Sequence, residues 1–327
     1  MTRRVRLGHI KGVEVSVDWS WVITFAVAAW TLFTVAEHWM VARGIFDLVV
    51  VSAAAAFGLF ASLVVHEVAH GLAARACGVP VRRLTLFLFG GITDVERDPA
   101  SPHTEVVAAL VAPLTNAVIG GALIGLAVVV DARTRTEGGW STVGFLVLWL
   151  GVVNVALAAF NLIPAFPLDG GRLVRAAIWR ATGDVERATR WAAWTGQLFG
   201  WLLVLGGVAV ALGTRGLGVV GGMWITFIGW FLSSAAAQAY EGVVAQTALA
   251  GVTIARVMRR TAEPETAEVA PDLVMRPDDD AARAHAALAE HDLERLPVFD
   301  DGHVVGFVER SDIQRFISAH ARRAAVA

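Results

Sequence analysis

The sequence predicts an α-helical polytopic membrane protein with six transmembrane helices, followed by a small cytoplasmic α/β module. Only 17% of its 327 residues are charged and 56% are hydrophobic, whereas a soluble domain carries about 25% charged residues. Six stretches lack Asp, Glu, Lys and Arg, and they approach the roughly 20 apolar residues that a membrane-spanning helix needs. A set of buried helices in a soluble protein is the alternative, but it rarely produces so many such runs. The stretches are Trp19–Ala36, Leu48–Val65, Val106–Val130, Trp140–Leu168, Trp191–Thr214 and Gly216–Tyr240.

The basic residues of the short loops alternate in abundance along the chain. Loops on the cytoplasmic side are usually richer in Lys and Arg. The N-terminus and the loops after the second and fourth stretches are rich in arginine, and the loops between them hold far fewer. We therefore expect a multi-pass protein of the cell membrane with both termini in the cytoplasm. The basic N-terminus leads straight into a full-length span, so no cleavable signal peptide is expected.

Charge and cysteine content argue against two classes of protein. The formal net charge is −2, so composition offers no case for a nucleic-acid partner. The single cysteine, Cys77, cannot form an internal disulfide, so no oxidised framework is expected.

The composition changes near residue 241, where charged residues become frequent. A polar stretch, Thr261–Glu268, has the character of a linker. Asp301 and Gly302 separate two short apolar runs, a strong signal for a β-hairpin. We divide the chain into a membrane core, residues 1–246, and a module, residues 247–327. The elements expected in the module are a helix around Asp280–Leu293, strands at Leu296–Phe299 and Val304–Val308, and a last helix capped by Ser311 and ending near Ile317–His320.

A metal-binding pattern follows the second apolar stretch: His66 and His70 frame Glu67 in the order H-E-x-x-H. Residues four apart share one face of a helix, so both imidazoles can point at one metal ion. Glu67 can reach a water molecule on that metal and take its proton. The alternative is a polar helix end with two hydrated histidines. Ionisable groups at the end of an apolar helix are costly and favour the functional interpretation.

A third ligand is expected, because catalytic zinc keeps three protein ligands and one open position. The fourth stretch carries no charge until Asp169. In the predicted topology the second and fourth spans run parallel, so both deliver their polar groups to the same depth. The alternative for Asp169 is an Asp-Gly-Gly turn that ends a helix.

Asn161 precedes Asp169 by eight residues, with Pro164 and Pro167 between them. Two prolines break a helix, and in lipid a broken backbone is tolerated only where it is buried in protein or lines a wet cavity. Asn161 can donate a hydrogen bond to a developing oxyanion or to a substrate backbone. A helix–helix hydrogen bond is the alternative, and it is the role expected of Asn116 and Asn154.

These two motifs, His66–His70 and Asn161–Gly170, together resemble those of the site-2 protease family, H-E-x-x-H and N-x-x-P-x-x-x-L-D-G. The resemblance covers roughly Gly8 to Tyr240. It implies an intramembrane zinc metalloprotease with one Zn²⁺ per subunit. It also implies that His66, His70 and Asp169 are the zinc ligands, that Glu67 is the general base and that Asn161 lies beside the scissile bond.

The segment Leu86–Ile92 looks like the re-entrant β-hairpin of that family. It is apolar, too short to span, and contains Gly90 and Gly91. An extended segment with a free edge can pair with an unwound substrate, so we expect both glycines to bind substrate. A hairpin that only packs against helix ends is the alternative. Arg82 and Arg83 could bind lipid headgroups.

The segment from about Val252 to Ile317 resembles a CBS domain, on the residues Leu296–Gly302, Gly306–Val308 and Ser311-Asp312. The family often binds adenine nucleotides such as ATP, and the resemblance implies that Asp312 would hold the ribose. Glu309 stands where Thr or Ser is usual, which speaks against a phosphate-facing role there. A nucleotide site normally forms between two CBS motifs and we find one, so a homodimer is implied. A packing domain without a ligand is the alternative.

The family also implies the reaction and its substrates. We expect regulated intramembrane proteolysis of a single-pass or hairpin membrane protein, such as an anti-sigma factor or a signal-peptide remnant. Two rival functions stay open: a CBS-regulated metal transporter, which needs ligands but no base, and a non-catalytic regulator.

Overall fold

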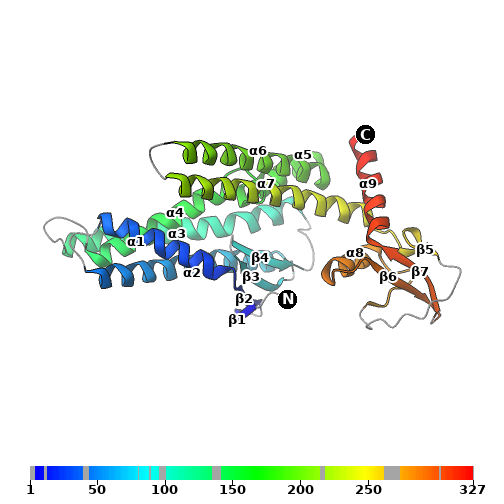
Figure 1. Ribbon diagram of the computed structural model, residues 1–327, viewed down its shortest axis with the longest axis horizontal. Helices are drawn as coiled ribbons and strands as arrows, with labels where there is room; N and C mark the ends of the chain where they lie inside the picture. Colours follow the sequence, from blue (N-terminus) through cyan, green and yellow to red (C-terminus); the bar gives the residue numbers. More distant parts are fainter. Residues whose placement is uncertain are drawn as a thin grey trace. The chain divides into compact units, whose positions relative to one another are not determined.

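The computed structural model describes residues 4–10, 13–39, 44–79, 81–87, 90–95, 101–134, 141–213, 218–260, 273–301 and 303–326 (Figure 1). The chain forms two compact units, Met1–Ala236 and Ala237–Ala327. Helix α7 (Gly218–Leu249) continues from the first unit into the second.

The first unit is mostly helical. Among the described residues, five helices are long and apolar enough to cross a membrane: α2 (Ile45–Ala76), α3 (Pro102–Thr134), α4 (Thr142–Asn161), α6 (Val185–Leu212) and α7. This supports a multi-pass membrane protein. Helix α1 (Trp21–Trp39) covers the first expected span but is not among the five, so the count of six spans stays a prediction. A shorter, amphipathic helix, α5 (Asp169–Thr182), follows α4.

The expected span Trp140–Leu168 is too long, because α4 ends at Asn161 and α5 begins only at Asp169. The seven residues between them include Pro164 and Pro167, and proline disfavours helix both at its own position and at the residue before it. The predicted break in the helix is therefore confirmed.

Small residues let the helices of this unit approach one another closely. A Cβ atom on Gly200 of α6 would lie 2.6 Å from the carbonyl oxygen of Gly229 on α7, and one on Gly120 of α3 would lie 2.7 Å from that of Gly151 on α4. Figure 1 shows α6 and α7 side by side. Close backbone packing of this kind is typical of helix association in lipid, where no hydrophobic force acts between helices.

A four-stranded sheet lies against the C-terminal part of α2. Its order is β1 (Arg4–Ile10), β2 (Val13–Asp18), β3 (Val81–Phe87) and β4 (Gly90–Val95). The β2–β3 pair is parallel and the other two are antiparallel. Val15 and Leu84 are buried with Ala74 of α2 in one apolar cluster. The expected hairpin at Leu86–Ile92 thus corresponds to β3 and β4, although residues 88 and 89 lie outside the described residues.

The second unit contains the four expected elements: α8 (Ala281–Glu290), β6 (Arg295–Asp300), β7 (His303–Glu309) and α9 (Arg310–Val326). Two short elements that were not expected, η1 (Ile254–Arg256) and β5 (Arg259–Arg260), precede them. Strands β6 and β7 are antiparallel, which confirms the hairpin, and Asp301 in its turn has a left-handed φ of 45°. The last helix starts one residue before Ser311 and continues past His320 to Val326. The expected linker, Thr261–Glu268, lies outside the described residues.

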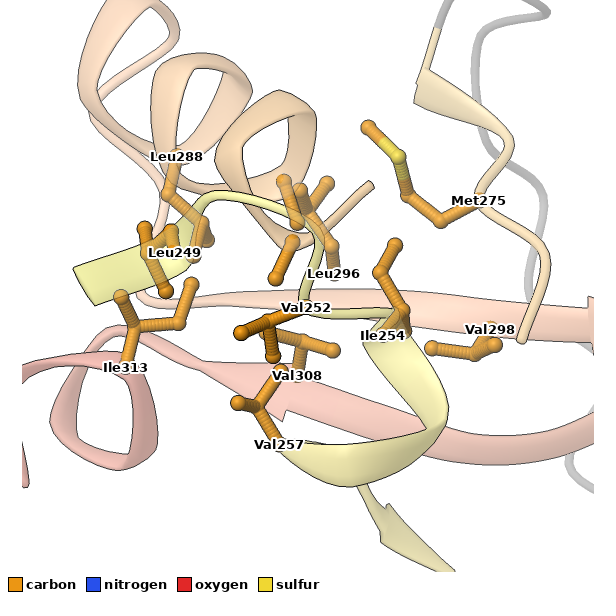
Figure 2. Packing of buried hydrophobic residues seen from close by; sticks show 12 residues of the cluster. Leu249, Val252, Ile254, Val257, Met275, Leu288, Leu296, Val298, Val308 and Ile313 are labelled. Carbon is orange, nitrogen blue, oxygen red and sulfur yellow. The ribbon is translucent and has the colours of Figure 1, made fainter. Parts of the chain in front are cut away.

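Both strands of the hairpin contribute buried side chains to the core of this unit. Leu296 and Val298 of β6 and Val308 of β7 are buried against Leu288 of α8 and Ile313 of α9 (Figure 2). The side chain of Asp280 caps α8 by accepting a hydrogen bond from the amide of Ala282 at 2.9 Å. Buried residues alternate along β7, as a sheet with one covered face requires, whereas Leu296, Pro297 and Val298 of β6 are all buried.

Candidate metal centre

Helix α2 carries the H-E-x-x-H motif near its C-terminal end. The rise from Ile45 to His66 is about 32 Å at 1.5 Å per residue, close to the roughly 30 Å of a bilayer's hydrocarbon core. His66 and Glu67 are only 5% and 8% exposed, and the side chain of His70 is 11% exposed. Three ionisable side chains are thus withdrawn from water on one turn of an apolar helix.

Asp169, the first residue of α5, is 5% exposed. The two glycines that follow it pack against the backbone of the segment joining α4 to α5. A Cβ atom on Gly170 would collide with the carbonyl oxygens of Leu162 and Ile163, and one on Gly171 would collide with the amide nitrogen of Phe166. Both positions therefore require glycine, and the close packing fixes where α5 begins.

The two histidines and Asp169 converge on one point. The Nε2 atoms of His66 and His70 lie 3.2 Å apart. His70 Nε2 lies 3.2 Å from Asp169 Oδ1, and His66 Nε2 lies 3.5 Å from Asp169 Oδ2. Bonds of about 2.0–2.2 Å in a tetrahedral arrangement place ligand atoms about 3.3–3.6 Å apart. One donor atom from each of the three residues lies within 4.8 Å of the other two, close enough for the three residues to share a single zinc ion.

The protonation pattern of His70 strengthens this fit. Its Nδ1 atom lies 2.8 Å from the carbonyl oxygen of Ala108 on α3; because that oxygen can only accept, Nδ1 carries the proton. In the neutral ring Nε2 then offers a lone pair, and it faces a carboxylate oxygen that is also an acceptor. Two facing acceptors repel unless a cation lies between them. A buried set of two imidazole nitrogens and one carboxylate is a donor set suited to zinc.

The asparagines behave differently from one another. Asn161 Nδ2 donates to the Leu157 carbonyl of its own helix at 3.0 Å, and its role beside a substrate stays a prediction. Asn154 Nδ2 donates to Ser62 Oγ on α2 at 2.9 Å, a helix–helix hydrogen bond of the expected kind. Asn116 is fully buried, and its side-chain atoms find no hydrogen-bond partner among the described residues.

The segment expected to bind substrate forms the edge of the sheet. Gly90 and Gly91 are paired with Phe87 and Leu86 of β3. Among the described residues β4 is the last strand, so its other edge has no strand partner there. The two arginines expected at lipid headgroups differ: Arg83 Nε lies 3.5 Å from Glu14 Oε1 on β2, whereas the side chain of Arg82 lies outside the described parts.

The carboxylate expected to hold a ribose is already paired. Asp312 Oδ1 accepts from Arg259 Nε and Nη2 at 3.1 and 3.0 Å, and Arg315 binds the same oxygen. Glu309 Oε2 lies 3.3 Å from Arg259 Nη2. Any ligand of Asp312 would have to compete with these two guanidinium groups.

Sequence reasoning misses a buried ion pair near the metal centre. Glu105 of α3 is fully buried, and its Oε1 atom accepts from Arg175 Nε of α5 at 2.6 Å. In the sequence Arg175 is only one of several arginines of an expected cytoplasmic loop. A lone glutamate at the start of an apolar stretch is the available signal, because such a charge needs a partner.

Fold and site together define a polytopic membrane protein with a buried group of two histidines and one aspartate that could hold a metal ion, and with a small α/β module. Residues 54–134 and 136–204 match the family model described as Peptidase family M50, and residues 266–319 match the CBS domain. The chain therefore belongs to peptidase family M50, the site-2 proteases, and carries a CBS domain. The resemblance found from the motifs is confirmed.

Two relatives extend the similarity beyond the motifs. Rip3 of Mycobacterium tuberculosis, whose name provisionally assigns it as a zinc metalloprotease, is 37% identical over 82% of this chain. A Synechocystis protein, sll0528, with the same provisional assignment, is 33% identical over 71% of this chain. The chain spans 66% of the length of Rip3 and 58% of that of sll0528.

A solved structure shares the fold. The site-2 protease from Methanocaldococcus jannaschii superposes with a TM-score of 0.50 and covers 82% of this chain and 100% of its own. Its sequence identity to this chain is 24%, so the similarity concerns the fold alone.

Proposed function

We propose that the protein is an intramembrane zinc metalloendopeptidase that hydrolyses peptide bonds of transmembrane or membrane-embedded substrates. One observation carries this proposal: the Nε2 atoms of His66 and His70 lie 3.2 Å apart, and each lies 3.2–3.5 Å from one carboxylate oxygen of Asp169, beside the buried carboxyl group of Glu67. The zinc metalloprotease names of the relatives support the same reaction.

His66, His70 and Asp169 would hold one Zn²⁺ per subunit. When bound, the ion lowers the pKa of a water ligand and polarises the carbonyl group under attack. The carbonyl oxygen of Ala108 accepts a hydrogen bond from the protonated Nδ1 atom of His70. This favours the tautomer whose Nε2 atom is free to bind a metal ion. A hydrogen bond of this kind also fixes the orientation of the ring.

Glu67 serves as the general base. It takes the proton of the attacking water as the C–O bond forms, and it gives that proton to the amide nitrogen as the C–N bond breaks. Its burial beside His66 shields this proton transfer from bulk water. Asn161 would turn its amide toward the oxyanion or the substrate backbone, which requires it to leave the Leu157 carbonyl.

The substrate must be unwound before it is cut, because the carbonyls of a membrane helix are bonded internally. The outer edge of β4 at Gly90 and Gly91 would pair with the extended substrate, as a re-entrant hairpin. The substrate class is a single-pass or hairpin membrane protein, such as an anti-sigma factor or a signal-peptide remnant, cut in regulated intramembrane proteolysis.

The membrane topology belongs to the same proposal. With α1 counted as a span, six spans would put both termini on the same side of the cell membrane, and the arginine-rich loops favour the cytoplasm as that side. The parallel pairing of β2, which precedes α1, with β3, which follows α2, supports this, because one sheet joins the two segments. The domain boundary at residues 246 and 247 falls inside the last turn of α7.

For the CBS module we propose a nucleotide-regulated homodimer, with an adenine nucleotide held by Asp312. Arg259 and Arg315 compete for that carboxylate. Calorimetric titration of the full chain with ATP and AMP tests the proposal, with Asp312→Asn as the control. A heat of binding in the natural chain that is lost in the variant supports the proposal. If the natural chain shows no heat of binding, the module is a packing domain without a nucleotide.

The experiment that separates protease from transporter is the substitution Glu67→Gln. A transporter needs metal ligands but no base, whereas a protease needs both. The full chain is co-expressed with tagged candidate membrane substrates, and cleavage is followed by the size of the tagged fragment. Glu67→Gln should retain zinc and abolish cleavage. Glu290→Gln, on the exposed side of α8, is the matched control and should cleave normally.

Three outcomes would count against the proposal. Cleavage that survives in Glu67→Gln removes the general base from the mechanism. Zinc uptake into proteoliposomes that is equal for the natural chain and Glu67→Gln, with no cleavage by either, supports the transporter. A natural chain that binds zinc but neither cleaves nor transports is the non-catalytic regulator.

A further inference from the structure

We propose that the buried pair Glu105–Arg175 is a positioning element that sets Asp169 against His66 and His70. The inference rests on the proposed zinc site. Glu105 Oε1 accepts a hydrogen bond from Arg175 Nε at 2.6 Å, and Nη2 of the same guanidinium group forms an ion pair with this oxygen at 2.5 Å. Glu105 is fully buried and Arg175 nearly so. Two converging donors fix the direction of the contact as well as its length.

The pair is expensive for a purely structural contact. Removing two charges from water costs more than their attraction returns unless the geometry is excellent, and apolar residues of similar size often stabilise a fold equally well. Arg172 Nε lies 4.0 Å from the same carboxylate oxygen, but its side chain is 28% exposed. Arg172, one turn earlier on α5, could therefore pair with Glu105 at a lower desolvation cost. The closer contact is nevertheless made by the buried Arg175.

Helix α3 uses this pair to join the two elements that carry the ligands. Glu105 precedes Ala108 by one turn, and the carbonyl oxygen of Ala108 accepts the Nδ1 proton of His70. Arg175 follows Asp169 by less than two turns of α5. Helix α3 thus contacts the metal-binding residue His70 of α2 through its backbone. It contacts α5, the helix that begins with Asp169, through the charged side chain of Glu105. A shift of α5 along α3 would change the spacing between His70 and Asp169.

The pair also holds the segment that leads into Asp169. The guanidinium carbon of Arg175 lies 5.8 Å from the ring centroid of Phe166. The backbone of Phe166 packs against Gly171 of α5 and Gly196 of α6, where a Cβ atom on either glycine would collide with it. Glu105 therefore acts through Arg175 on both sides of the carboxylate ligand.

Metal geometry gives the test, because Co²⁺ in place of Zn²⁺ reports the coordination sphere through its visible spectrum. The full chain, Glu105→Gln and Arg175→Lys are purified and loaded with Co²⁺, and Zn²⁺ affinity is measured by competition with a chelator. We expect the two variants to bind zinc about 10- to 100-fold more weakly, the usual loss when a residue that orients a ligand is changed, and to show altered Co²⁺ bands. Arg180→Met, on the exposed side of the same helix, should match the natural chain.

The double variant Glu105→Leu/Arg175→Met separates positioning from stability. An apolar pair leaves no unpaired buried charge, so the unfolding temperature of the metal-free protein should return to that of the natural chain, while zinc affinity stays reduced. Recovery of both properties would overturn the inference. So would unchanged affinity and Co²⁺ spectrum in Glu105→Gln, which carries the test if the double variant does not fold. A natural chain that binds neither metal would instead refute the zinc site itself.

Discussion

The Nδ1 atom of His70 and the carbonyl oxygen of Ala108 lie 2.8 Å apart, which links the metal-binding turn of α2 to the backbone of α3. The contact decides which nitrogen of the ring is left for a metal. In the neutral ring it also leaves the Nε2 lone pair 3.2 Å from a carboxylate oxygen, an arrangement that is unfavourable without a cation.

Removal of the metal should therefore destabilise the protein. A ligand that binds only the folded state adds about 2.7 kcal/mol at 100 times its dissociation constant. We expect the unfolding temperature of the detergent-solubilised, metal-free chain to rise on addition of Zn²⁺. In Asp169→Ala the rise should be largely lost. An equal rise in both proteins would mean that zinc stabilises the chain from somewhere else.

Gly196 should tolerate no side chain. In Gly196→Ala the new Cβ atom would collide with the Phe166 carbonyl, and overpacking of this kind costs about 1–3 kcal/mol. The displaced segment leads into Asp169, so zinc retention should fall as well. Gly206→Ala lies on the same helix, where a Cβ atom would meet no described atom within 4 Å. It should be neutral or slightly stabilising, because alanine favours helix over glycine by about 0.5–1 kcal/mol. Equal thermal stability of the two variants would contradict this account.

The hydrogen bond from Asn154 to Ser62 should couple α4 to α2. Hydrogen bonds between membrane helices average about 0.6 kcal/mol in double-mutant cycles. We expect a coupling of that size between Ser62→Ala and Asn154→Leu in reversible unfolding in detergent. Ser52 donates only to Leu48 of its own helix, so Ser52→Ala should show no coupling to Asn154→Leu.

The CBS module should lose stability on mild acidification. Burial lowers the pKa of His285 below its ordinary value, and the positive charge of Arg310 lowers it further. The folded state thus resists a proton that the unfolded state takes up near pH 6.5. The stabilising effect is complete above that pH and is lost as the pH falls toward the lowered pKa. Hydrogen exchange of α8, corrected for intrinsic rates, should show less protection at pH 5.5 than at pH 7. His285→Gln should reduce the difference, and an unchanged difference would assign it to another group.

Most of the site could be predicted from sequence because its ligands stand in short local patterns. His66 and His70 share a face by helical spacing alone, and Pro164 and Pro167 mark the end of α4 directly. The proximity of Asp169 to the histidines could be predicted from the expected parallel direction of the second and fourth spans alone. Local chemistry also predicted the hairpin of the module, through Asp301 and its neighbour.

The remainder depends on contacts between distant segments. Nothing local to Glu105 identifies Arg175 as its partner, since only the packing of α3 on α5 brings them together. The strands β1 and β2 were not predicted for another reason. Val13, Val15 and Val17 alternate with polar residues, which is the period-two pattern of a strand. The basic residues nearby were interpreted only as evidence for a cytoplasmic N-terminus, so the strand pattern was overlooked.

Whether the two histidines and the aspartate bind one metal ion is measured most directly by X-ray absorption at the zinc edge of the purified chain. We expect a first shell of nitrogen and oxygen atoms at about 2.0–2.2 Å, with the multiple-scattering pattern of two imidazole rings. In Asp169→Ala one oxygen contribution should be lost or replaced by solvent, and in His66→Ala one imidazole should disappear. Zinc bound through sulfur, or a first shell unchanged in both variants, would contradict the assignment of His66, His70 and Asp169 to one metal ion.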